Sequence, residues 1–214
     1  MRTLNEIFNE HGSDKGTVDP GWGYVHGYGP IYELLIGHLR EKPIRLLEIG
    51  IWKGASLRSW LEYFPLASVF AMDNGSACTL EQISVDTKRS RIIRADQGDR
   101  QELKNAVESF GGMFDVIIDD GSHISSHQQT SLGFLFPYVV SGGLYIIEDL
   151  TLPGRPLPQG FDNSDTTSAI IDRRWNAMPY AISDEQDYLD QNVSHTTLEP
   201  DMTGGYCCCI IYKR

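Results

Sequence analysis

Apolar positions along the chain fall into two recurring patterns. Short unbroken apolar runs are typical of strands buried on both faces, whereas apolar residues every three or four positions are typical of helices. The runs predict strands at 44–49, 68–72, 91–95, 114–118 and 143–147. The helical spacing predicts helices at 31–39, 56–63, 101–110 and 125–137. Strands that alternate with helices in this way indicate an α/β fold.

The expected architecture is a doubly wound, Rossmann-like parallel sheet with helices on both faces. After Leu150 the pattern weakens. There, 151–161 is rich in proline and glycine, 165–178 could be a helix, and 192–198 and 206–213 look like two final strands. A closing hairpin beside the fifth strand would complete a seven-stranded, mostly parallel sheet with an antiparallel closing strand. We expect residues 1–214 to form a single domain.

A glycine-rich segment precedes the first predicted strand. Six glycines lie between Gly12 and Gly29, interleaved with the aromatic residues Trp22, Tyr24, His26 and Tyr28. Such a composition is unfavourable for a helix or a strand and predicts an ordered loop over 12–32. Two interpretations stay open: a surface loop that packs its aromatic side chains on the core, or a flap over a ligand.

Each of the five predicted strands ends in, or is directly followed by, at least one carboxylate or carboxamide. In an open parallel sheet, ligands bind beyond the carboxyl ends of the strands, so these side chains predict a site at that edge. In chain order they are Glu48, Asp73 with Asn74, Asp96 with Gln97, Asp119 with Asp120, and Glu148 with Asp149.

The turn after the first predicted strand reads Gly50-Ile51-Trp52-Lys53-Gly54. A dinucleotide site needs a glycine where Trp52 stands, so that the backbone can approach a pyrophosphate. A P-loop is excluded because no GK[ST] follows. Asp73 comes 19 residues after Gly54 and could accept hydrogen bonds from both hydroxyls of a ribose. The turn therefore favours a nucleoside cofactor without phosphates.

Two of the strand ends carry paired acids, and these two strands should be neighbours in the sheet. Clustered carboxylates repel one another unless a cation lies between them. Oxygen ligands select Mg²⁺, Mn²⁺ or Ca²⁺ over zinc. Alternatively, the acids cap the helices that follow them. His123 comes three residues after Asp120, and its position beside a metal site favours a catalytic role over a structural one.

The composition of the chain limits the classes of partner that the protein can bind. The chain has 18 basic and 29 acidic residues, a net charge of −11 and a pI near 4.9, which argues against nucleic acid or an anionic membrane as a partner. Cys78 and the run 207–209 form no CxxC pair and predict buried thiols in a reducing compartment. The N-terminus is polar and lacks the features of a signal peptide. We therefore expect a cytoplasmic protein.

Two stretches carry a family resemblance. Residues 48–60 and the string FDVIIDDGSH at 114–123, together with Asp73, resemble class I S-adenosylmethionine-dependent methyltransferases. Within that class they are similar to the metal-dependent sugar O-methyltransferases of macrolide biosynthesis, of the macrocin and mycinamicin type, and to cephalosporin-hydroxylase-like relatives. The strings SDKG at 13–16 and HGY at 26–28 share this resemblance, which covers residues 10 to 150.

The resemblance implies two cofactors, S-adenosylmethionine and Mg²⁺ or another hard divalent cation, and it implies roles for particular residues. The implied cofactor-binding residues are Gly50, Ser56 and Asp119 around the methionine part, Asp73 at the ribose, Asp96 and Gln97 near the adenine, and also Glu48 and Tyr28. The implied metal ligands are Asp120, Glu148 and Asp149, and the implied general base is His123. A flap or arm over 1–32 would cover the cofactor, and an insert at 151–190 would shape the acceptor pocket.

The expected function is methyl transfer from S-adenosylmethionine to a hydroxyl of a sugar or a sugar-bearing small natural product. A metal would bind the substrate oxygen and a histidine would take its proton. Two alternatives stay open: a catechol-like or other vicinal-diol acceptor, and a cofactor-binding accessory protein without transferase activity. Trp52 disfavours NAD(P)-dependent chemistry. We expect a small-molecule partner, neither nucleic acid nor membrane, and, as in the family, a homo-oligomer.

Overall fold

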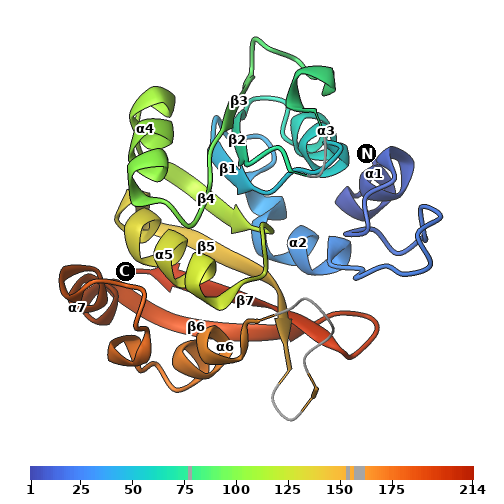
Figure 1. The fold of residues 1–214 in the computed structure, drawn as a ribbon. Coiled ribbons are helices and arrows are strands. Elements are labelled where there is room, and N and C mark those ends of the chain that lie inside the picture. The colour runs from blue at the N-terminus through green and yellow to red at the C-terminus, as the bar shows by residue number, and fades with distance from the viewer. Residues whose placement is uncertain (77–78, 153–154, 157–161) are drawn as a thin grey trace.

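A seven-stranded sheet organises the protein (Figure 1). The computed structural model describes residues 1–214 except 77–78, 153–154 and 157–161. The strands are β1 Arg45–Ile49, β2 Ser68–Asp73, β3 Ser90–Arg94, β4 Phe114–Asp119, β5 Val139–Thr151, β6 Val193–Pro200 and β7 Tyr206–Lys213. Their order across the sheet is β3-β2-β1-β4-β5-β7-β6.

Strand directions match the predicted topology. β1 pairs in parallel with β2 and β4, and β4 pairs in parallel with β5, whereas β7 runs antiparallel to both β5 and β6. The doubly wound, mostly parallel sheet with a closing antiparallel strand is therefore confirmed. The strand order reverses between β1 and β4, which is the switch point where such sheets bind their ligands.

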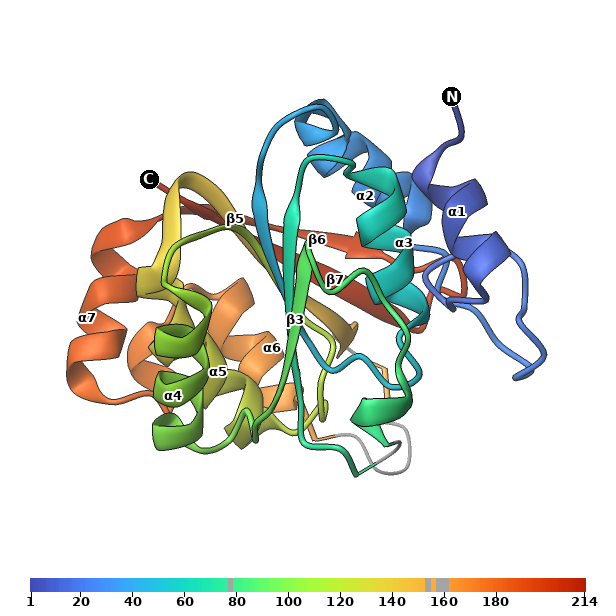
Figure 2. The same cartoon turned by 90° about the horizontal axis from the view of Figure 1, so that it is seen from above.

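Seven helices of the described chain cover the two faces of the sheet (Figure 2). They are α1 Leu4–His11, α2 Gly29–Ile36, α3 Ala55–Tyr63, α4 Arg100–Phe110, α5 Ser125–Leu135, α6 Ser164–Ile171 and α7 Ser183–Asn192, with 3₁₀ turns at 37–39, 80–82, 136–138 and 175–177. Helices α1, α2 and α3 lie on one face, and α4 to α7 lie on the other. Each face has its own core: Phe8 and Trp60 belong to the first, Phe114 and Trp175 to the second.

Helix α1 was not among the predicted elements, although its signals are local. Thr3 caps the helix and accepts from the backbone of Glu6, whose side chain reaches back to the Thr3 backbone. This capping box satisfies backbone groups that the first turn would otherwise leave unpaired. Gly12 ends the helix in the left-handed conformation, at φ 72°. Leu4, Ile7 and Phe8 then pack into the core.

The predicted helix 165–178 is wrong as a single element. Helix α6 ends at Ile171, Arg173 takes a positive φ of 51°, and a separate 3₁₀ turn covers 175–177. Helix α7 was also missed, because its sequence SDEQDYLDQN carries little apolar periodicity. Tertiary contact supports it instead: Arg100 of α4 forms a salt bridge of 2.7 Å with Glu185 of α7.

Strand β5 is longer than the predicted 143–147. It begins at Val139, bends around Gly142 at φ 76°, and continues to Thr151. Its pairing with β7 is interrupted between Ile147 and Leu150, so Glu148 and Asp149 lie in an irregular part of the strand rather than beyond its end. Pairing of Leu150 with Cys207 resumes the ladder. Glu148 and Asp149 are therefore flanked on both sides by residues of β5 that pair with β7.

Among the helices in the described ranges, none combines the length and the apolar character that a membrane span requires. Cys207, Cys208 and Cys209 lie on β7 as buried free thiols. Burial raises the pKa of the Cys207 thiol to about 12. The fourth cysteine, Cys78, lies outside the described residues.

Candidate functional site

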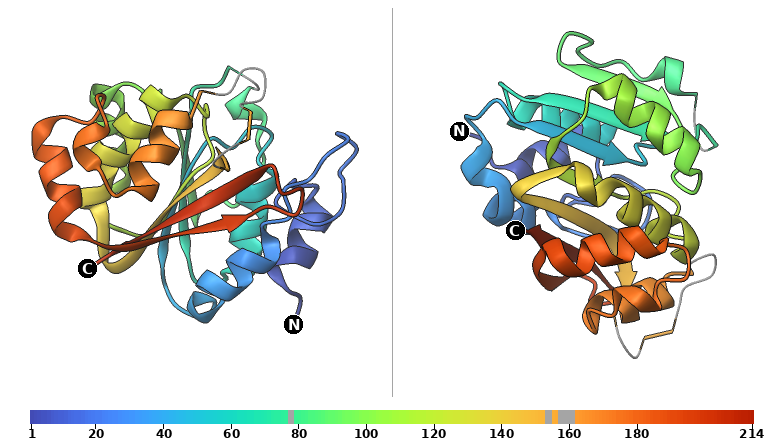
Figure 3. Two further views of the ribbon diagram at one scale, coloured as in Figure 1. Left: turned by 90° about the horizontal axis from the view of Figure 1, so that it is seen from below. Right: turned by 90° about the vertical axis from the view of Figure 1, so that its left-hand side faces the viewer.

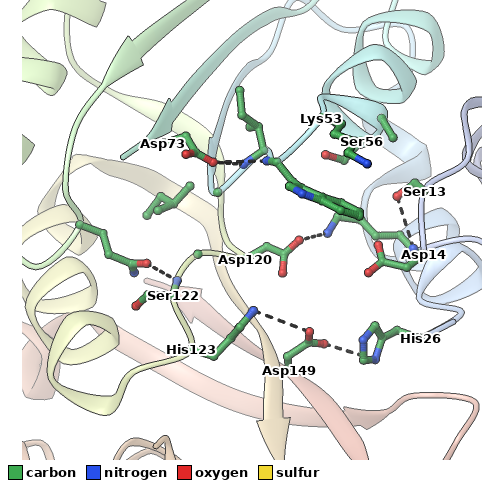
Figure 4. A pocket seen from close by; sticks show the side chains of 18 of the residues that line it. Ser13, Asp14, His26, Lys53, Ser56, Asp73, Asp120, Ser122, His123 and Asp149 are labelled. Carbon is green, nitrogen blue, oxygen red and sulfur yellow. Dashed lines mark hydrogen bonds and ion pairs between the residues drawn. The ribbon is translucent and has the colours of Figure 1, made fainter. Parts of the chain in front are cut away.

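A cavity of about 1140 Å³ lies at the carboxyl ends of β1, β2, β4 and β5 (Figure 4). The loop 12–28 and the β6–β7 turn supply further walls. The predicted site residues that line it are Gly50, Ser56, Asp73, Asp96, Gln97, Asp120, His123 and Asp149. Four others, Tyr28, Glu48, Asp119 and Glu148, are buried behind its lining. The predicted site residues thus form a lining layer and a supporting layer.

The glycine at position 50 is required by the fold itself. Gly50 has a φ of 79°, and a Cβ atom there would lie 2.1 Å from the carbonyl oxygen of Asp120. The Asp120 amide also donates to the Ile49 carbonyl, at 2.9 Å. The chain after β4 therefore passes directly against the turn after β1. The glycine brings the predicted cofactor turn and the predicted metal ligand together.

Asp73, the predicted ribose ligand, fastens the same turn. Its Oδ2 accepts from the backbone of Ile51 at 2.9 Å and of Trp52 at 3.3 Å, and its Oδ1 accepts from Gly75 at 2.7 Å. Because a carboxylate has about four acceptor positions, these bonds leave capacity for a ligand. The side chain lines the cavity and lies next to the Trp52 turn.

Gln97 and Asp119 form a buried pair below the predicted adenine region. The Gln97 amide donates to both Asp119 oxygens, at 2.9 and 3.1 Å, and its carbonyl accepts from the Ser122 backbone at 2.7 Å. Ser131 and Tyr145 also donate to Asp119. Burial raises the pKa of the Asp119 carboxyl. The Gln97 side chain is thus committed to protein groups, while its neighbour Asp96 lines the cavity and accepts from Gly98.

Asp120, His123 and Asp149 form a cluster with the spacing of a metal site. One ligand atom from each lies within 4.8 Å of the others. His123 Nε2 is 4.0 Å from Asp149 Oδ2. Both His123 and Asp149 have positive φ values, 57° and 56°, as does the cavity-lining Trp52 at 41°. Such backbone costs of order 1–3 kcal/mol each and is concentrated at functional sites.

Lys15 places a positive charge beside two of the predicted metal ligands, Asp120 and Glu148. Lys15, in the loop after α1, is 1% exposed, and its Nζ donates to Asp120 Oδ2 and, at 2.9 Å, to Glu148 Oε2. Burial alone would lower the pKa of Lys15, but Asp120 and Glu148 outweigh it and raise that pKa well above its usual range. The Tyr32 hydroxyl donates to the other oxygen of Glu148. Glu148, a predicted metal ligand, is therefore engaged by two protein donors.

Asp149 is held from the opposite side by the HGY segment. The Tyr28 hydroxyl donates to Asp149 Oδ1 at 3.1 Å, and His26 Nδ1 lies 3.4 Å from the same oxygen. His26 Nδ1 is also 3.1 Å from Asp201 Oδ2, in the β6–β7 turn. Roles for Lys15, His26 and Asp201 were not predicted from the sequence. The SDKG and HGY strings were the available signal for the first two.

Glu48 was a predicted cofactor-binding residue, and 151–190 was the predicted acceptor-site insert. Glu48 lies at the end of β1 with no exposed surface, and burial raises its pKa to about 7. Along 151–190, the residues that the structure describes do not line this cavity. In that stretch, Thr166 of α6 pairs instead with Ser125 of α5, at 2.8 Å.

Comparison with known proteins finds no matching family model but several relatives. Mycinamicin VI 2''-O-methyltransferase of Micromonospora griseorubida is 38% identical over 138 residues, which are 61% of this chain and 33% of that protein. L-olivosyl-oleandolide 3-O-methyltransferase of Streptomyces antibioticus is 36% identical over 177 residues, 78% of this chain and 43% of that protein. Demethylmacrocin O-methyltransferase of Streptomyces fradiae is 36% identical over 154 residues, 69% of this chain and 36% of that protein.

Solved structures point to the same relatives. The MycE methyltransferase of mycinamycin biosynthesis, in complex with Mg, SAH and mycinamycin VI, is 27% identical with a TM-score of 0.69. That match covers 99% of this chain and 54% of that one. A putative O-methyltransferase from Klebsiella pneumoniae shares the fold, with a TM-score of 0.57 at 17% identity, and the match covers 99% and 88% of the two chains. The resemblance carried by 48–60 and 114–123 is confirmed. The chain spans only about a third to a half of the length of these relatives.

Proposed function

We propose that this chain, a homologue of the natural-product sugar O-methyltransferases, transfers a methyl group from S-adenosylmethionine to a hydroxyl of a sugar or a sugar-bearing small molecule. The observation that carries the proposal is that one cavity joins the Gly50 turn and Asp73 to the cluster of Asp120, His123 and Asp149. A nucleoside cofactor and an acceptor hydroxyl can then meet within one enclosure.

The cavity suits the cofactor in size and chemistry. Pockets for one drug-sized ligand measure roughly 300–1,000 Å³, so about 1140 Å³ leaves room for a nucleoside and part of an acceptor. Asp73 would accept from the ribose hydroxyls, and Asp96 would lie near the adenine. Trp52 stands where a pyrophosphate would need a bare backbone, which favours a cofactor without phosphates.

The acid cluster fits a hard divalent cation. Asp120 and Asp149 present carboxylate oxygens within 4.8 Å of one another, and Lys15 places a positive charge beside Asp120 and Glu148. Asp120 and Asp149 would hold the ion, and Glu148 would join them only if it shared its oxygens with Lys15. When bound, S-adenosylmethionine supplies an electrophilic methyl group, and the cation lowers the pKa of the acceptor hydroxyl.

His123 would act as the general base. Its imidazole lines the cavity, and the Asp149 carboxylate 4.0 Å from Nε2 would stabilise the imidazolium that forms when it takes the acceptor proton. The positive φ of His123 sets the direction of its side chain. The fixed walls of the cavity would hold the acceptor oxygen and the methyl group near reacting distance.

The surrounding segments support further parts of the proposal. The loop 12–28 would be the flap over the cofactor, because Trp22 and Tyr24 line the cavity and Trp22 packs on Trp52 of the cofactor turn. Three expectations stay predictions: an acceptor-binding role for 151–190, a single domain over 1–214 and a homo-oligomer. The acceptor would be a small molecule.

Titration calorimetry of the metal-stripped protein with S-adenosylhomocysteine, and then with Mg²⁺, tests the two sites separately. We expect micromolar nucleoside binding that Asp73→Ala weakens at least about tenfold, equivalent to about 1.4 kcal/mol. Asp86→Ala, at an exposed acid outside the cavity, is the matched control. Asp120→Asn should abolish the Mg²⁺ event. A wild-type protein that binds no nucleoside would exclude the proposed activity.

Replacement of His123 by alanine tests the base. Turnover with labelled S-adenosylmethionine and a glycoside acceptor should fall by about 10²-fold or more, because general-base catalysis contributes about that much. Affinity for S-adenosylhomocysteine should stay nearly intact. His195→Ala, on the edge strand β6, should leave both quantities at the wild-type level. Unchanged turnover in His123→Ala would remove His123 from the mechanism.

A further inference from the structure

The two carboxylate oxygens of Asp149 have different surroundings. Oδ1 accepts from the Tyr28 hydroxyl at 3.1 Å and lies 3.4 Å from His26 Nδ1. Oδ2 lies 4.0 Å from His123 Nε2 (Figure 4). The backbone carbonyl of Asp149 accepts from the Asn163 amide at 2.7 Å. Side chains from three segments thus surround a residue whose backbone has a φ of 56°.

His26 is itself fixed by a second carboxylate. Its Nδ1 is 3.1 Å from Asp201 Oδ2 and 3.4 Å from Asp149 Oδ1. Because ionised carboxylates only accept hydrogen bonds, Nδ1 must carry the proton that faces both of them. The imidazole also stacks on Tyr28, with centroids 5.4 Å apart and planes 8° from parallel, and it is 5% exposed. The ring therefore has one orientation, in which Nδ1 donates to Asp201 and also lies 3.4 Å from Asp149 Oδ1.

Asp201 is anchored by the turn between β6 and β7. Its side chain has no exposed surface and accepts from the Thr203 backbone, the Thr203 hydroxyl and the Gly205 backbone. The backbone of Met202 in turn donates to the His26 carbonyl at 2.8 Å. Figure 3 shows the loop after α1 lying beside the far end of the β6–β7 hairpin. The N-terminal loop is thus docked on this turn at His26.

We infer that His26, oriented by Asp201 and assisted by Tyr28, is a positioning residue that holds Asp149 in the orientation for binding a divalent cation. The inference rests on the proposed metal-dependent function. It makes the N-terminal loop and the β6–β7 turn part of the metal site, although neither supplies a ligand. Substitution of a residue that holds a metal ligand in place typically costs 10–100-fold in metal affinity.

Titration of the metal-stripped full chain with Mn²⁺ tests this without any acceptor substrate. His26→Leu should bind Mn²⁺ 10–100-fold more weakly than the wild type. His26→Asn places an amide nitrogen close to the position of Nδ1 and should recover affinity to within a few-fold. His195→Leu, at a histidine of the edge strand β6, is the matched control and should bind as the wild type does.

Two further measurements exclude a merely structural effect. Affinity for S-adenosylhomocysteine should be the same in all variants, which shows that the cofactor end stays folded. Asp201→Asn should weaken Mn²⁺ binding in the wild-type background but add little to His26→Leu, because Asp201 acts through His26.

The outcomes separate this inference from the proposed function. If the wild type binds Mn²⁺ and His26→Leu binds it equally well, the inference is wrong and the metal site stands. If His26→Asn is as weak as His26→Leu, packing of the ring rather than its N–H group matters, and the inference is also wrong. If the wild type binds no Mn²⁺, the proposed metal site itself fails.

Discussion

The two ends of the cavity are built in different ways. At the cofactor end, Asp73 bonds to the backbone of the Gly50 turn, and the turn packs on the chain after β4. At the acid end, four separate segments converge: Lys15 and His26 come from the N-terminal loop, Asp120 follows β4, Asp149 lies within β5, and Asp201 belongs to the β6–β7 turn. Backbone contacts therefore determine the shape of the cofactor end, whereas buried charge pairs hold the acid end together.

Each end of the cavity is therefore sensitive to a different kind of change. A backbone contact fails when a side chain intrudes, whatever the pH or the metal content. A cluster of buried charges fails when its charges no longer balance, so its stability depends on protons and cations. Substitutions at the two ends should therefore separate these two behaviours.

The largest effect is expected at the cofactor end. Gly50→Ala would place a Cβ atom 2.1 Å from the Asp120 carbonyl oxygen, at a φ of 79°. Strained backbone and steric overlap together should lower the free energy of unfolding by roughly 3–5 kcal/mol. Thermal unfolding followed by circular dichroism should show a Tm lower by about 10 °C or more.

Gly142→Ala is the matched control for this prediction. Gly142 has almost the same φ, 76°, but a Cβ atom there would meet nothing within 4 Å. Its cost should be that of the backbone alone, about 1–2 kcal/mol. Equal losses in the two variants would show that the contact with Asp120 does not require the glycine.

An effect of similar size is expected at the acid end in the absence of metal, and it should become smaller when metal is added. Lys15→Met removes the buried ammonium from Asp120 and Glu148, and an unbalanced buried ion pair typically costs about 3–5 kcal/mol. In EDTA the Tm should fall. Added Mg²⁺ should raise it more than in the wild type, because a bound cation stabilises the folded state and here replaces the missing charge.

Lys104→Met, at an exposed pair with Glu108, serves as the control and should change little. A Lys15→Met protein as stable in EDTA as the wild type would contradict the view that the acids need this internal cation.

The smallest effect should be a change in pH dependence. Burial raises the pKa of Glu48 from 4.5 to about 7, so between these values the folded state binds more protons than the unfolded state. The stability that this provides is fully present below pH 4.5 and is lost as the pH rises through 7, by about 3 kcal/mol in total. Glu48→Gln should flatten the decline in urea midpoint between pH 5 and 8.

Glu108→Gln, at an exposed carboxyl, should leave that decline unchanged. A Glu48→Gln protein with the wild-type slope would show that this carboxyl does not titrate between those pH values.

Sequence patterns alone predicted the alternation of strands and helices, the acids at the strand ends and the Gly50 turn, because apolar period and turn chemistry are local properties of the chain. The errors lie where local signals are weak or are overruled. Helix α7 lacks apolar periodicity and depends on Arg100, and the predicted helix 165–178 is interrupted by Arg173. The length of β5 was decided by its pairing with β7.

The side chains that share the acid end could be identified only in the folded chain. Lys15 meets Glu148 across 133 positions of sequence, and His26 meets Asp201 across 175. A strand-end acid can be recognised from its own neighbourhood, but the cation and the histidine that face it come from a loop of no regular period. Their roles follow from folding, because a buried charge needs a partner and only the folded chain brings these partners together.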